Sequence, residues 1–199
     1  MKIKFSKERI EFEKNLSNID KFVMDFILIL NKLKINYVLI SGYVSIMFGR
    51  NRASEDIDIF IEKLTIARFK GLWEELSKKF ECINASDFKS AYEDYLLKGT
   101  AIRFSKSKSY IPNMEVKFPK NELDEWTIKN KRKVILNREM LFISPLELQI
   151  PFKLFLGSEK DIEDARYLYK LFKDNIDAGL LKEFNRKLNI EPLFDKYLR

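Results

Sequence analysis

The stretch YVLISGYVSIMFGRNRASEDIDIFIE, Tyr37–Glu62, decides the fold of this chain. Its first four residues form an apolar run that predicts a buried strand, which Ser41-Gly42 breaks. Val44–Phe48 then shows the apolar spacing of a short helix, and Gly49 ends it. Asp56–Ile61 begins with alternating acidic and aliphatic residues, the period of a strand with one face in a core. The predicted order is therefore strand, tight turn, short helix, loop and strand.

Helical and strand patterns flank this stretch on both sides. Ser17–Lys34 carries apolar residues at helical spacing behind a capping pair. Further helices are predicted over Leu64–Phe80, Asp87–Leu97, Pro145–Leu156, Asp161–Phe172 and Leu180–Leu188, and further strands over Thr100–Ser105 and Asn113–Phe118. We therefore expect an α+β fold: a small mixed β-sheet flanked by helices over residues 1–120, followed by a mainly helical C-terminal region, residues 121–199, that forms a helical bundle packed on this core.

The composition narrows the chemistry that the chain can perform. Its 37 Lys and Arg against 30 Asp and Glu give a net charge of +7, which attracts nucleotides and nucleic acids. A thermophile-like surface of ion-pair networks explains the same charges equally well. The absence of histidine excludes Ser-His-Asp triads and imidazole zinc sites built within the chain. The lone Cys82 cannot form an internal disulfide, which suits a reducing compartment.

No segment of the sequence predicts membrane insertion or export. The longest apolar stretch, Phe22–Leu30, is interrupted by Asp25 and is too short to span a bilayer. The opening MKIKFSKERIEF lacks the apolar region of a signal peptide. We therefore expect a soluble cytoplasmic protein.

Asp56 and Asp58 are the first candidate functional residues. Carboxylates at positions i and i+2 of a strand project from one face, with Cα atoms about 6.6 Å apart. Hard oxygen ligands in that arrangement suit Mg²⁺. An amphipathic strand whose acids simply face water would show the same two residues. The neighbouring Ser41-Gly42 turn favours the metal, because a small-residue turn at a helix start lets a phosphate approach the backbone.

This whole stretch resembles the signature of the polymerase-β-type nucleotidyltransferase superfamily: a Gly-Gly or Gly-Ser turn, a short helix, Gly and Arg, and a strand with paired acids. The resemblance implies a nucleotidyltransferase fold in which Ser41 and Gly42 hold the phosphates of a nucleoside triphosphate and Asp56 and Asp58 bind Mg²⁺ or Mn²⁺. Ser41 departs from the pattern, since the family commonly has Gly there. Arg52 and Ser54, in the intervening loop, are further candidates for triphosphate binding.

The resemblance also implies a third acid on a neighbouring strand. Glu115 is the candidate, because Met114 and Val116 would point to the opposite face and leave Glu115 and Lys117 together on the site face. A half-exposed strand with a cross-strand ion pair explains the same pattern equally well. Glu115 is therefore predicted as a third metal ligand and catalytic carboxylate, with the ion pair as the alternative.

A second stretch, ELQIPFKLFLGSEKDIEDARYLYKLF, Glu147–Phe172, resembles a motif of the abortive-infection (AbiEii-type) nucleotidyltransferase toxins and related nucleotidyltransferases. The resemblance implies that Lys153 contacts the triphosphate, that Lys160 matches the basic position of the motif and that Asp161 and Asp164 match its two acids. An interaction with the helix dipole explains Asp161, at the start of a helix, equally well. From the residues themselves, we interpret Lys160 and Asp164 as an exposed i,i+4 pair. Lys153 is assigned a functional role because it lies within an otherwise apolar helix segment.

Together these patterns predict a Mg²⁺-dependent nucleotidyltransferase. It would transfer a nucleoside monophosphate from a nucleoside triphosphate to a hydroxyl group of an RNA, protein or small-molecule acceptor, with release of pyrophosphate. Two alternatives remain open: the toxin of a toxin–antitoxin pair that modifies tRNA and binds an antitoxin, and a non-catalytic nucleotide- or RNA-binding module of the same fold. The predicted site comprises Asp56, Asp58 and Glu115 for metal binding and catalysis, and Ser41, Gly42, Arg52, Ser54, Lys153 and Asp161 for nucleotide binding.

Overall fold

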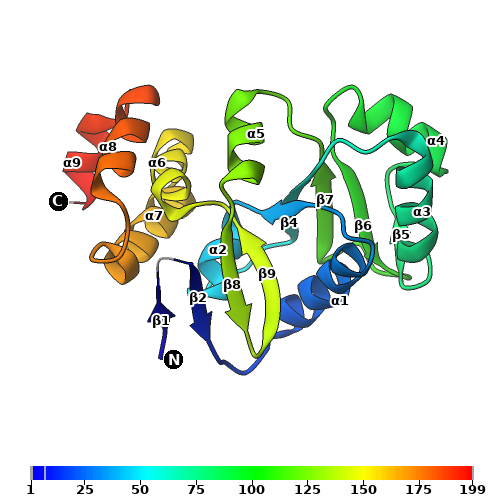
Figure 1. Ribbon diagram of the computed structural model, residues 1–199, viewed down its shortest axis with the longest axis horizontal. Coiled ribbons are helices and arrows are strands. Elements are labelled where there is room, and N and C mark those ends of the chain that lie inside the picture. The colour runs from blue at the N-terminus through cyan, green and yellow to red at the C-terminus, as the bar shows by residue number, and fades with distance from the viewer. Residues whose placement is uncertain (1, 7, 199) are drawn as a thin grey trace.

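Strands β3 (Tyr37–Leu39) and β4 (Asp56–Ile61), from the stretch that decides the fold, pair antiparallel at the centre of a mixed sheet (Figure 1). The computed structural model describes residues 2–6 and 8–198. In these residues the sheet has nine strands in the order β1-β2-β8-β9-β3-β4-β7-β6-β5. The other strands are β1 (Lys4–Phe5), β2 (Arg9–Phe12), β5 (Phe80–Cys82), β6 (Ile102–Lys106), β7 (Asn113–Lys117), β8 (Arg132–Leu136) and β9 (Glu139–Ile143).

The register of three neighbouring strands positions the candidate acids. β4 and β7 are parallel, and Asp58 lies directly opposite Glu115. β6 is antiparallel to β7, and Arg103 lies opposite Glu115 on its other side. Because directly opposed residues on neighbouring strands share a face of the sheet, these three side chains are brought together on one face.

The opposite face of the sheet is covered by α1 (Asn18–Lys32) and α3 (Ile66–Leu76) (Figure 1). Ser17 begins α1 with a capping box in which its hydroxyl accepts from the Asp20 amide and the Asp20 carboxylate accepts from the Ser17 amide. The aromatic ring of Phe26, on α1, packs edge-on against Phe80, with ring centroids 5.2 Å apart. This apolar layer therefore covers the face of the sheet opposite the acids.

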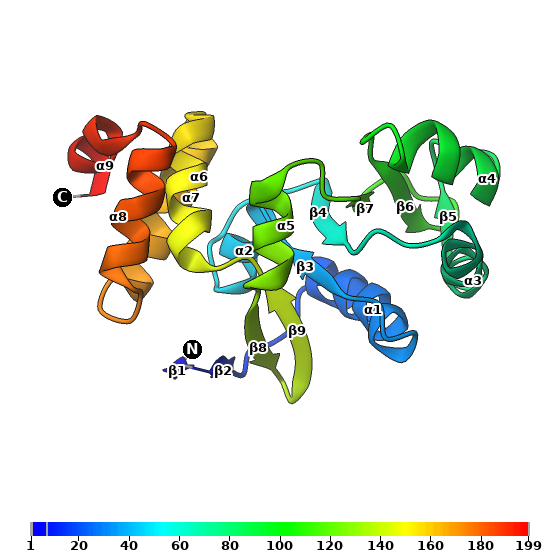
Figure 2. The same ribbon diagram turned by 45° about the horizontal axis from the view of Figure 1, so that its top comes forward.

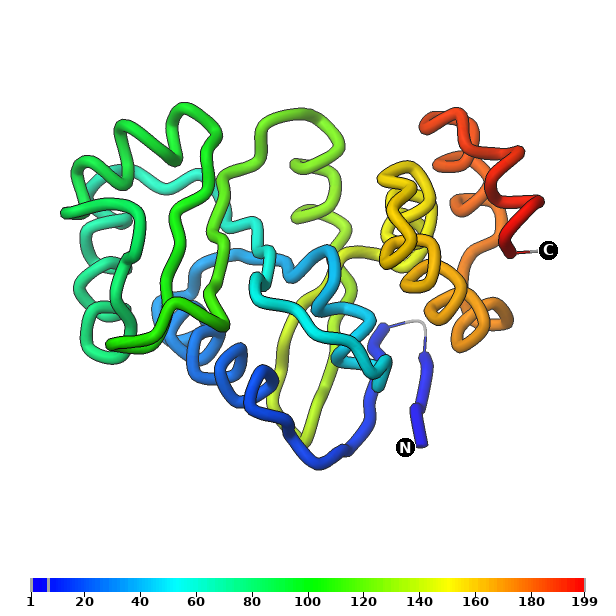
Figure 3. The backbone as a smooth tube through the Cα atoms, turned by 180° about the vertical axis from the view of Figure 1, so that it is seen from behind, coloured from blue at the N-terminus to red at the C-terminus, as the bar shows by residue number. Residues whose placement is uncertain are grey.

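The C-terminal helices form a bundle at one end of the sheet (Figures 2 and 3). α6 (Leu146–Leu156) packs on α7 (Glu159–Phe172) and α8 (Ala178–Lys187), and α9 (Glu191–Leu198) packs on α7. The short helix α2 (Gly42–Met47) joins this bundle to the sheet. The Phe48 and Phe172 rings meet edge-on at 4.7 Å, and the Tyr167 hydroxyl donates to the Phe48 carbonyl at 2.9 Å.

The predicted α+β fold with a mixed sheet is confirmed, and the sheet extends further along the chain than the sequence indicated. β8 and β9 form a hairpin within a region that we expected to be mainly helical. Its Asn137-Arg138 turn has two positive φ angles, 50° and 71°, as a two-residue hairpin turn requires. The sequence analysis did not recognise the alternation of buried Val134, Leu136, Leu141 and Ile143, because basic residues flank it and the turn contains no glycine.

Two helical segments also differ from expectation. Asp87–Leu97, predicted as one helix, is a short turn, α4 (Phe88–Ser90), that runs into a π-helical turn, Ala91–Leu96. α5 (Glu122–Lys129), after the Asn121 cap, stands on the acid-bearing side of the sheet (Figure 2). None of the helices in the described residues is long and apolar enough to cross a lipid bilayer.

Candidate active site

The side chains of Asp56 and Asp58 lie on the face of β4 that the core does not cover. Ile57, Ile59 and Ile61 alternate with them and are fully buried on the other face. Asp56 is exposed and Asp58 is half-buried. The alternation of a strand with one buried face therefore places both carboxylates together and keeps them accessible.

Glu115 and Lys117 share that face. The Lys117 ammonium lies between two carboxylates, 2.7 Å from Asp58 Oδ1 and 2.9 Å from Glu115 Oε2. Arg103 contacts the other Glu115 oxygen, Oε1, at 2.8 Å through Nε and at 2.6 Å through Nη2. We call these five residues, Asp56, Asp58, Arg103, Glu115 and Lys117, the strand site.

The pKa values of Glu115 and Lys117 follow from these contacts. Burial acts to raise the pKa of the Glu115 carboxyl, but the hydrogen bonds and charges of Lys117 and Arg103 outweigh it and hold that pKa below its ordinary value. Burial acts to lower the pKa of Lys117, but Asp58 and Glu115 outweigh it and raise that pKa. Both groups are therefore charged at neutral pH.

The side chains that donate hydrogen bonds to Asp56 are neutral, while the charge of Arg103 also acts on its carboxylate. The Asn113 side-chain amide donates to Asp56 Oδ1 at 2.7 Å, and the Ser54 hydroxyl donates to the Asp56 carbonyl at 2.9 Å. Ser54, predicted to bind nucleotide, thus caps the beginning of β4 in this arrangement.

Two of the carboxylates of the strand site suit a divalent cation. Asp56 and Asp58 fit, because both offer carboxylate oxygens on one accessible face and hard oxygen donors suit Mg²⁺ and Mn²⁺. Within residues 2–6 and 8–198, no three acidic or cysteine side chains converge in a way that would hold a metal. Both Glu115 oxygens already contact cations, so its assignment as a third ligand stays a prediction.

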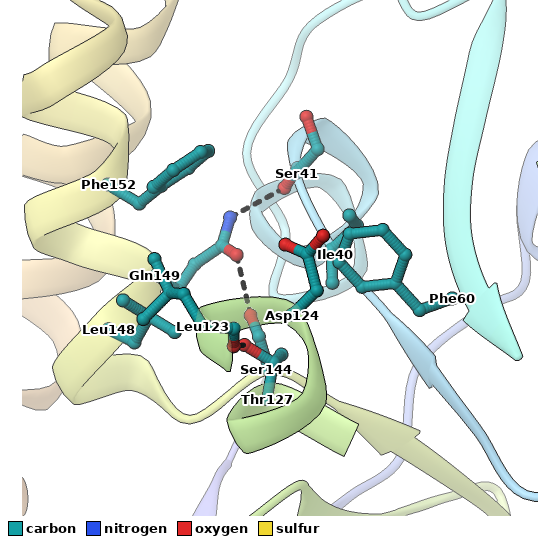
Figure 4. Close-up of a pocket in the computed structure, with 10 residues that line it drawn as sticks. All are labelled: Ile40, Ser41, Phe60, Leu123, Asp124, Thr127, Ser144, Leu148, Gln149 and Phe152. Carbon is teal, nitrogen blue, oxygen red and sulfur yellow. Dashed lines mark hydrogen bonds between the residues drawn. The ribbon is translucent and has the colours of Figure 1, made fainter. Parts of the chain in front are cut away.

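The Ser41-Gly42 turn lies beside these acids. The Ile40 amide donates to the Asp58 carbonyl at 3.0 Å, which fixes the end of β3 against the beginning of β4. Ser41 has φ 62° and ψ −137°, a conformation that costs a non-glycine residue energy. The Gln149 side-chain amide donates to the Ser41 carbonyl at 2.8 Å, and Gln149 accepts from the Ser144 hydroxyl at 2.6 Å (Figure 4). Helix α6 therefore holds the turn in shape.

Gly42 provides a close approach for Arg52. A Cβ atom at Gly42 would lie 2.7 Å from the Arg52 Nη2 atom, which is closer than such atoms approach. Arg52 Nη1 in turn contacts Asp164 Oδ2 at 2.6 Å. The absence of a side chain at Gly42 thus lets a guanidinium group rest against the first turn of α2.

Five charged side chains form a second group, which we call the buried ion cluster: Arg50, Arg52, Lys153, Asp161 and Asp164. Asp164 is fully buried and contacts Arg50, Arg52 and Lys153, the last at 3.0 Å through Nζ. Lys153 also contacts Asp161, and its side chain is 3% exposed. The interpretation of Lys160 and Asp164 as an exposed pair was wrong, because Asp164 turns inward to meet the loop arginines.

Asp161 has two partners in this cluster. It accepts from Lys153 and from the Ser158 hydroxyl, which caps α7. Burial acts to raise the pKa of the Asp161 carboxyl, but these hydrogen bonds and the charges of Lys153 and Arg52 outweigh it and lower that pKa. Asp161 is therefore an anion that orients Lys153.

Neither a family model nor a curated protein matches this sequence. Several solved structures are similar over most of the chain, among them the following two. An antigenic nucleotidyltransferase-like protein from Paracoccidioides brasiliensis is 16% identical, with 92% of this chain and 93% of that chain covered and a TM-score of 0.54. ANT(2″)-Ia, in complex with adenylyl-2″-tobramycin, is 11% identical, with 86% and 99% covered and a TM-score of 0.55. This chain has the nucleotidyltransferase fold.

A small pocket opens beside the turn of this nucleotidyltransferase fold (Figure 4). It lies between β4, α5 and α6. Five apolar side chains line it, together with the carboxylate of Asp124, the amide of Gln149 and the hydroxyl residues Ser41, Thr127 and Ser144. Phe60 lies on the same face of β4 as the two aspartates. The hollow measures about 70 Å³, well below the roughly 300 Å³ at which ligand pockets begin. It can therefore take only part of a ligand, whose remainder would lie along the open strand face.

The sequence analysis did not predict three residues of the site, which are Arg103, Asn113 and Gln149. Arg103 alternates with buried Ile102 and Phe104 on β6, a pattern that could have placed it on the face of Glu115. Asn113 and Gln149 carried no local signal, because their partners Asp56 and Ser41 lie far away in the sequence.

Proposed function

We propose that this protein transfers a nucleoside monophosphate from a nucleoside triphosphate to a hydroxyl group and releases pyrophosphate. One observation carries the proposal: the paired carboxylates Asp56 and Asp58 stand on the strand that is hydrogen-bonded to Ile40, the residue directly before the Ser41-Gly42 turn. A turn suited to phosphate thus lies next to carboxylates suited to a divalent cation. The nucleotidyltransferase fold supports this pairing of roles.

Asp56 and Asp58 would hold the divalent cation, Mg²⁺ or Mn²⁺. When bound, that ion neutralises phosphate charge and orients the triphosphate for in-line displacement. Glu115 is the candidate for a third carboxylate, placed directly opposite Asp58. It would assist deprotonation of the attacking hydroxyl.

Gly42, Arg52 and Lys153 would bind the phosphates. The buried ion cluster contains three cations and two carboxylates, so it carries one excess positive charge beside the turn. Excess positive charge in a partly desolvated site attracts a phosphate group more strongly than it would in water. Ser41 contributes the turn itself, Asp161 fixes Lys153, and Ser54 fixes the beginning of β4.

The apolar pocket would hold one edge of the base or sugar. Phe60 and Phe152 offer apolar ring surface at its rim, and Phe152 is 38% exposed. Flat apolar rings of this kind stack on nucleobases without selecting one base by hydrogen bonds. The pocket therefore supports nucleotide binding in general and favours no particular triphosphate.

The acceptor of the nucleoside monophosphate is a hydroxyl group of an RNA, a protein or a small molecule. The neighbour ANT(2″)-Ia, whose structure contains adenylyl-2″-tobramycin, supports a small-molecule hydroxyl as the first class to test. Closeness to the abortive-infection toxins, action on tRNA and an antitoxin partner remain predictions from the resemblance alone.

Labelled transfer tests the proposal. The protein is incubated with each α-phosphate-labelled triphosphate, Mg²⁺, and separate pools of RNA, protein and small hydroxyl compounds. Wild type should transfer label to one pool and release pyrophosphate, and Asp58→Asn should reduce transfer at least about a thousandfold, because it removes a metal carboxylate. Asp94→Asn, at an exposed acid that pairs with Lys98, is the matched control and should transfer normally. Equal transfer by wild type and Asp58→Asn would reject the proposal.

A further inference from the structure

The ammonium group of Lys117 joins two strands at the point where their acids meet. Nζ is 2.7 Å from Asp58 on β4 and 2.9 Å from Glu115 on β7. These two residues are direct partners in the sheet. Only 26% of the Lys117 side chain is exposed, so this contact differs from the loose surface pairs that contribute little. One fixed positive charge thus lies between two carboxylates that a bridging divalent cation would need.

Arg103 completes the neutralisation of Glu115. Both of its contacts go to Glu115 Oε1, while Lys117 contacts Oε2. Two positive charges therefore face one carboxylate, and each of its oxygens is engaged. A divalent cation would meet repulsion from both groups at this position.

Asp56 offers a different environment. Its carboxylate accepts a hydrogen bond from the neutral side-chain amide of Asn113, and Arg103 acts on it through charge without a direct contact. Asp58 contacts Lys117 through Oδ1 alone. The side of the strand site that faces Asp56 is therefore the side on which a divalent cation gains the most from carboxylate charge.

We propose that Lys117 is a positioning residue that takes the place of a second divalent cation. The strand site then holds one divalent cation, on Asp56 and Asp58, next to the fixed Lys117 ammonium. This inference rests on the proposed function. An ammonium group has three donors, and Asp58 and Glu115 use two of them. The third would donate to a phosphate oxygen of a bound triphosphate.

Direct titration with Mn²⁺ tests this inference without any acceptor or turnover. Free Mn²⁺ is measured by electron paramagnetic resonance in the presence of the full chain. Wild type should bind one Mn²⁺ per chain. Lys117→Met should bind Mn²⁺ at least about tenfold more tightly, or bind a second ion, because it removes a like charge from the site and frees Glu115.

Two matched variants show whether Mn²⁺ binding depends on a positive charge at position 117 or on the net charge of the protein. Lys117→Arg keeps the charge at the site, and Lys120→Met removes an exposed charge three residues away. Both should bind Mn²⁺ as wild type does. Lys117→Gln, which keeps a hydrogen-bonding side chain, provides the same test if Lys117→Met does not fold, and it should also tighten Mn²⁺ binding.

The outcomes distinguish this inference from the proposed function. Two Mn²⁺ ions bound by wild type, or unchanged binding in folded Lys117→Met and Lys117→Gln, would overturn the role of Lys117. If Asp58→Asn still abolishes Mn²⁺ binding in that case, the proposed metal site stands. If Asp58→Asn leaves Mn²⁺ binding unchanged, the metal site of the proposed function fails as well.

Discussion

The strand site and the buried ion cluster flank the same turn, yet they are built in opposite ways. In the strand site, the alternation of β4 and β7 presents Asp56, Asp58 and Glu115 on one face. In the buried ion cluster, Asp164 is fully buried and gathers side chains from a loop and from α6. The strand site faces solvent and a prospective ligand. In the buried ion cluster Asp164 and Lys153 are buried, while Arg50, Arg52 and Asp161 stay partly exposed beside the turn.

The strand site and the buried ion cluster therefore have different roles. Exposed acids on a strand contribute little to stability and are available to bind a cation. A buried carboxylate surrounded by three cations is costly to disturb, because removal of either sign leaves the other unpaired. The buried ion cluster therefore holds the loop, the turn and the helical bundle together, while the strand site is free for chemistry.

Removal of Asp164 should produce the largest loss of stability. Asp164→Ala leaves Arg50, Arg52 and Lys153 with one acidic partner, so the free energy of unfolding should fall by about 3 to 5 kcal/mol. Chemical denaturation followed by circular dichroism measures the change. Asp94→Ala, at an exposed pair, should change stability by no more than about 0.5 kcal/mol. If the two variants unfold alike, the buried ion cluster has no structural role.

Gly42→Ala should weaken nucleotide binding at the turn between the strand site and the buried ion cluster. The new methyl group would displace the Arg52 guanidinium from the turn, so affinity for a nucleoside triphosphate should fall about tenfold with a stability loss of about 1 kcal/mol. Calorimetric titration with a non-hydrolysable triphosphate measures the affinity. Gly71→Ala, where an added methyl group meets no neighbour within 4 Å, is the matched control and should bind normally. Normal binding by Gly42→Ala would show that phosphates do not use this turn.

Ser41→Gly should relieve the backbone strain in the turn. Glycine adopts the Ser41 backbone conformation without steric cost, although it adds freedom to the unfolded chain. The net effect should be a gain in unfolding free energy of about 1 kcal/mol. Thermal and chemical denaturation of the variant and of Ser41→Ala measure it. A destabilised Ser41→Gly would mean that the Ser41 side chain contributes more than its backbone strain costs.

The smallest expected effect is a pH dependence shared by both groups. The folded-state pKa values of Glu115 and Asp161 lie below their ordinary values. The unfolded chain therefore binds more protons near those ordinary values, about 4, so stability is full above that pH and is lost as pH falls through the folded pKa values. Unfolding of wild type and Glu115→Gln from pH 7 to pH 3 measures this, and the Glu115→Gln curve should be flatter. Parallel curves would contradict the assignment of Glu115.

The sequence predicts the strand site far better than the buried ion cluster. Asp56 and Asp58 share a face because of local alternation, and the turn follows from Ser41-Gly42 at the end of an apolar run. Asp164 instead depends on the packing of α7 against the loop after α2, which no local pattern specifies. A pair spaced i,i+4 fits an exposed helix face equally well, so the burial of Asp164 could be found only from the tertiary structure.

The binding of a nucleoside triphosphate, with and without Mg²⁺, tests the central claim most directly. Calorimetry with a non-hydrolysable triphosphate is carried out on wild type and on the double variant Asp56→Asn, Asp58→Asn. Mg²⁺ should strengthen binding to wild type about tenfold or more and should have no such effect on the double variant. Triphosphate binding by wild type that is indifferent to Mg²⁺, or equal enhancement in both proteins, would contradict a cation site on these two aspartates.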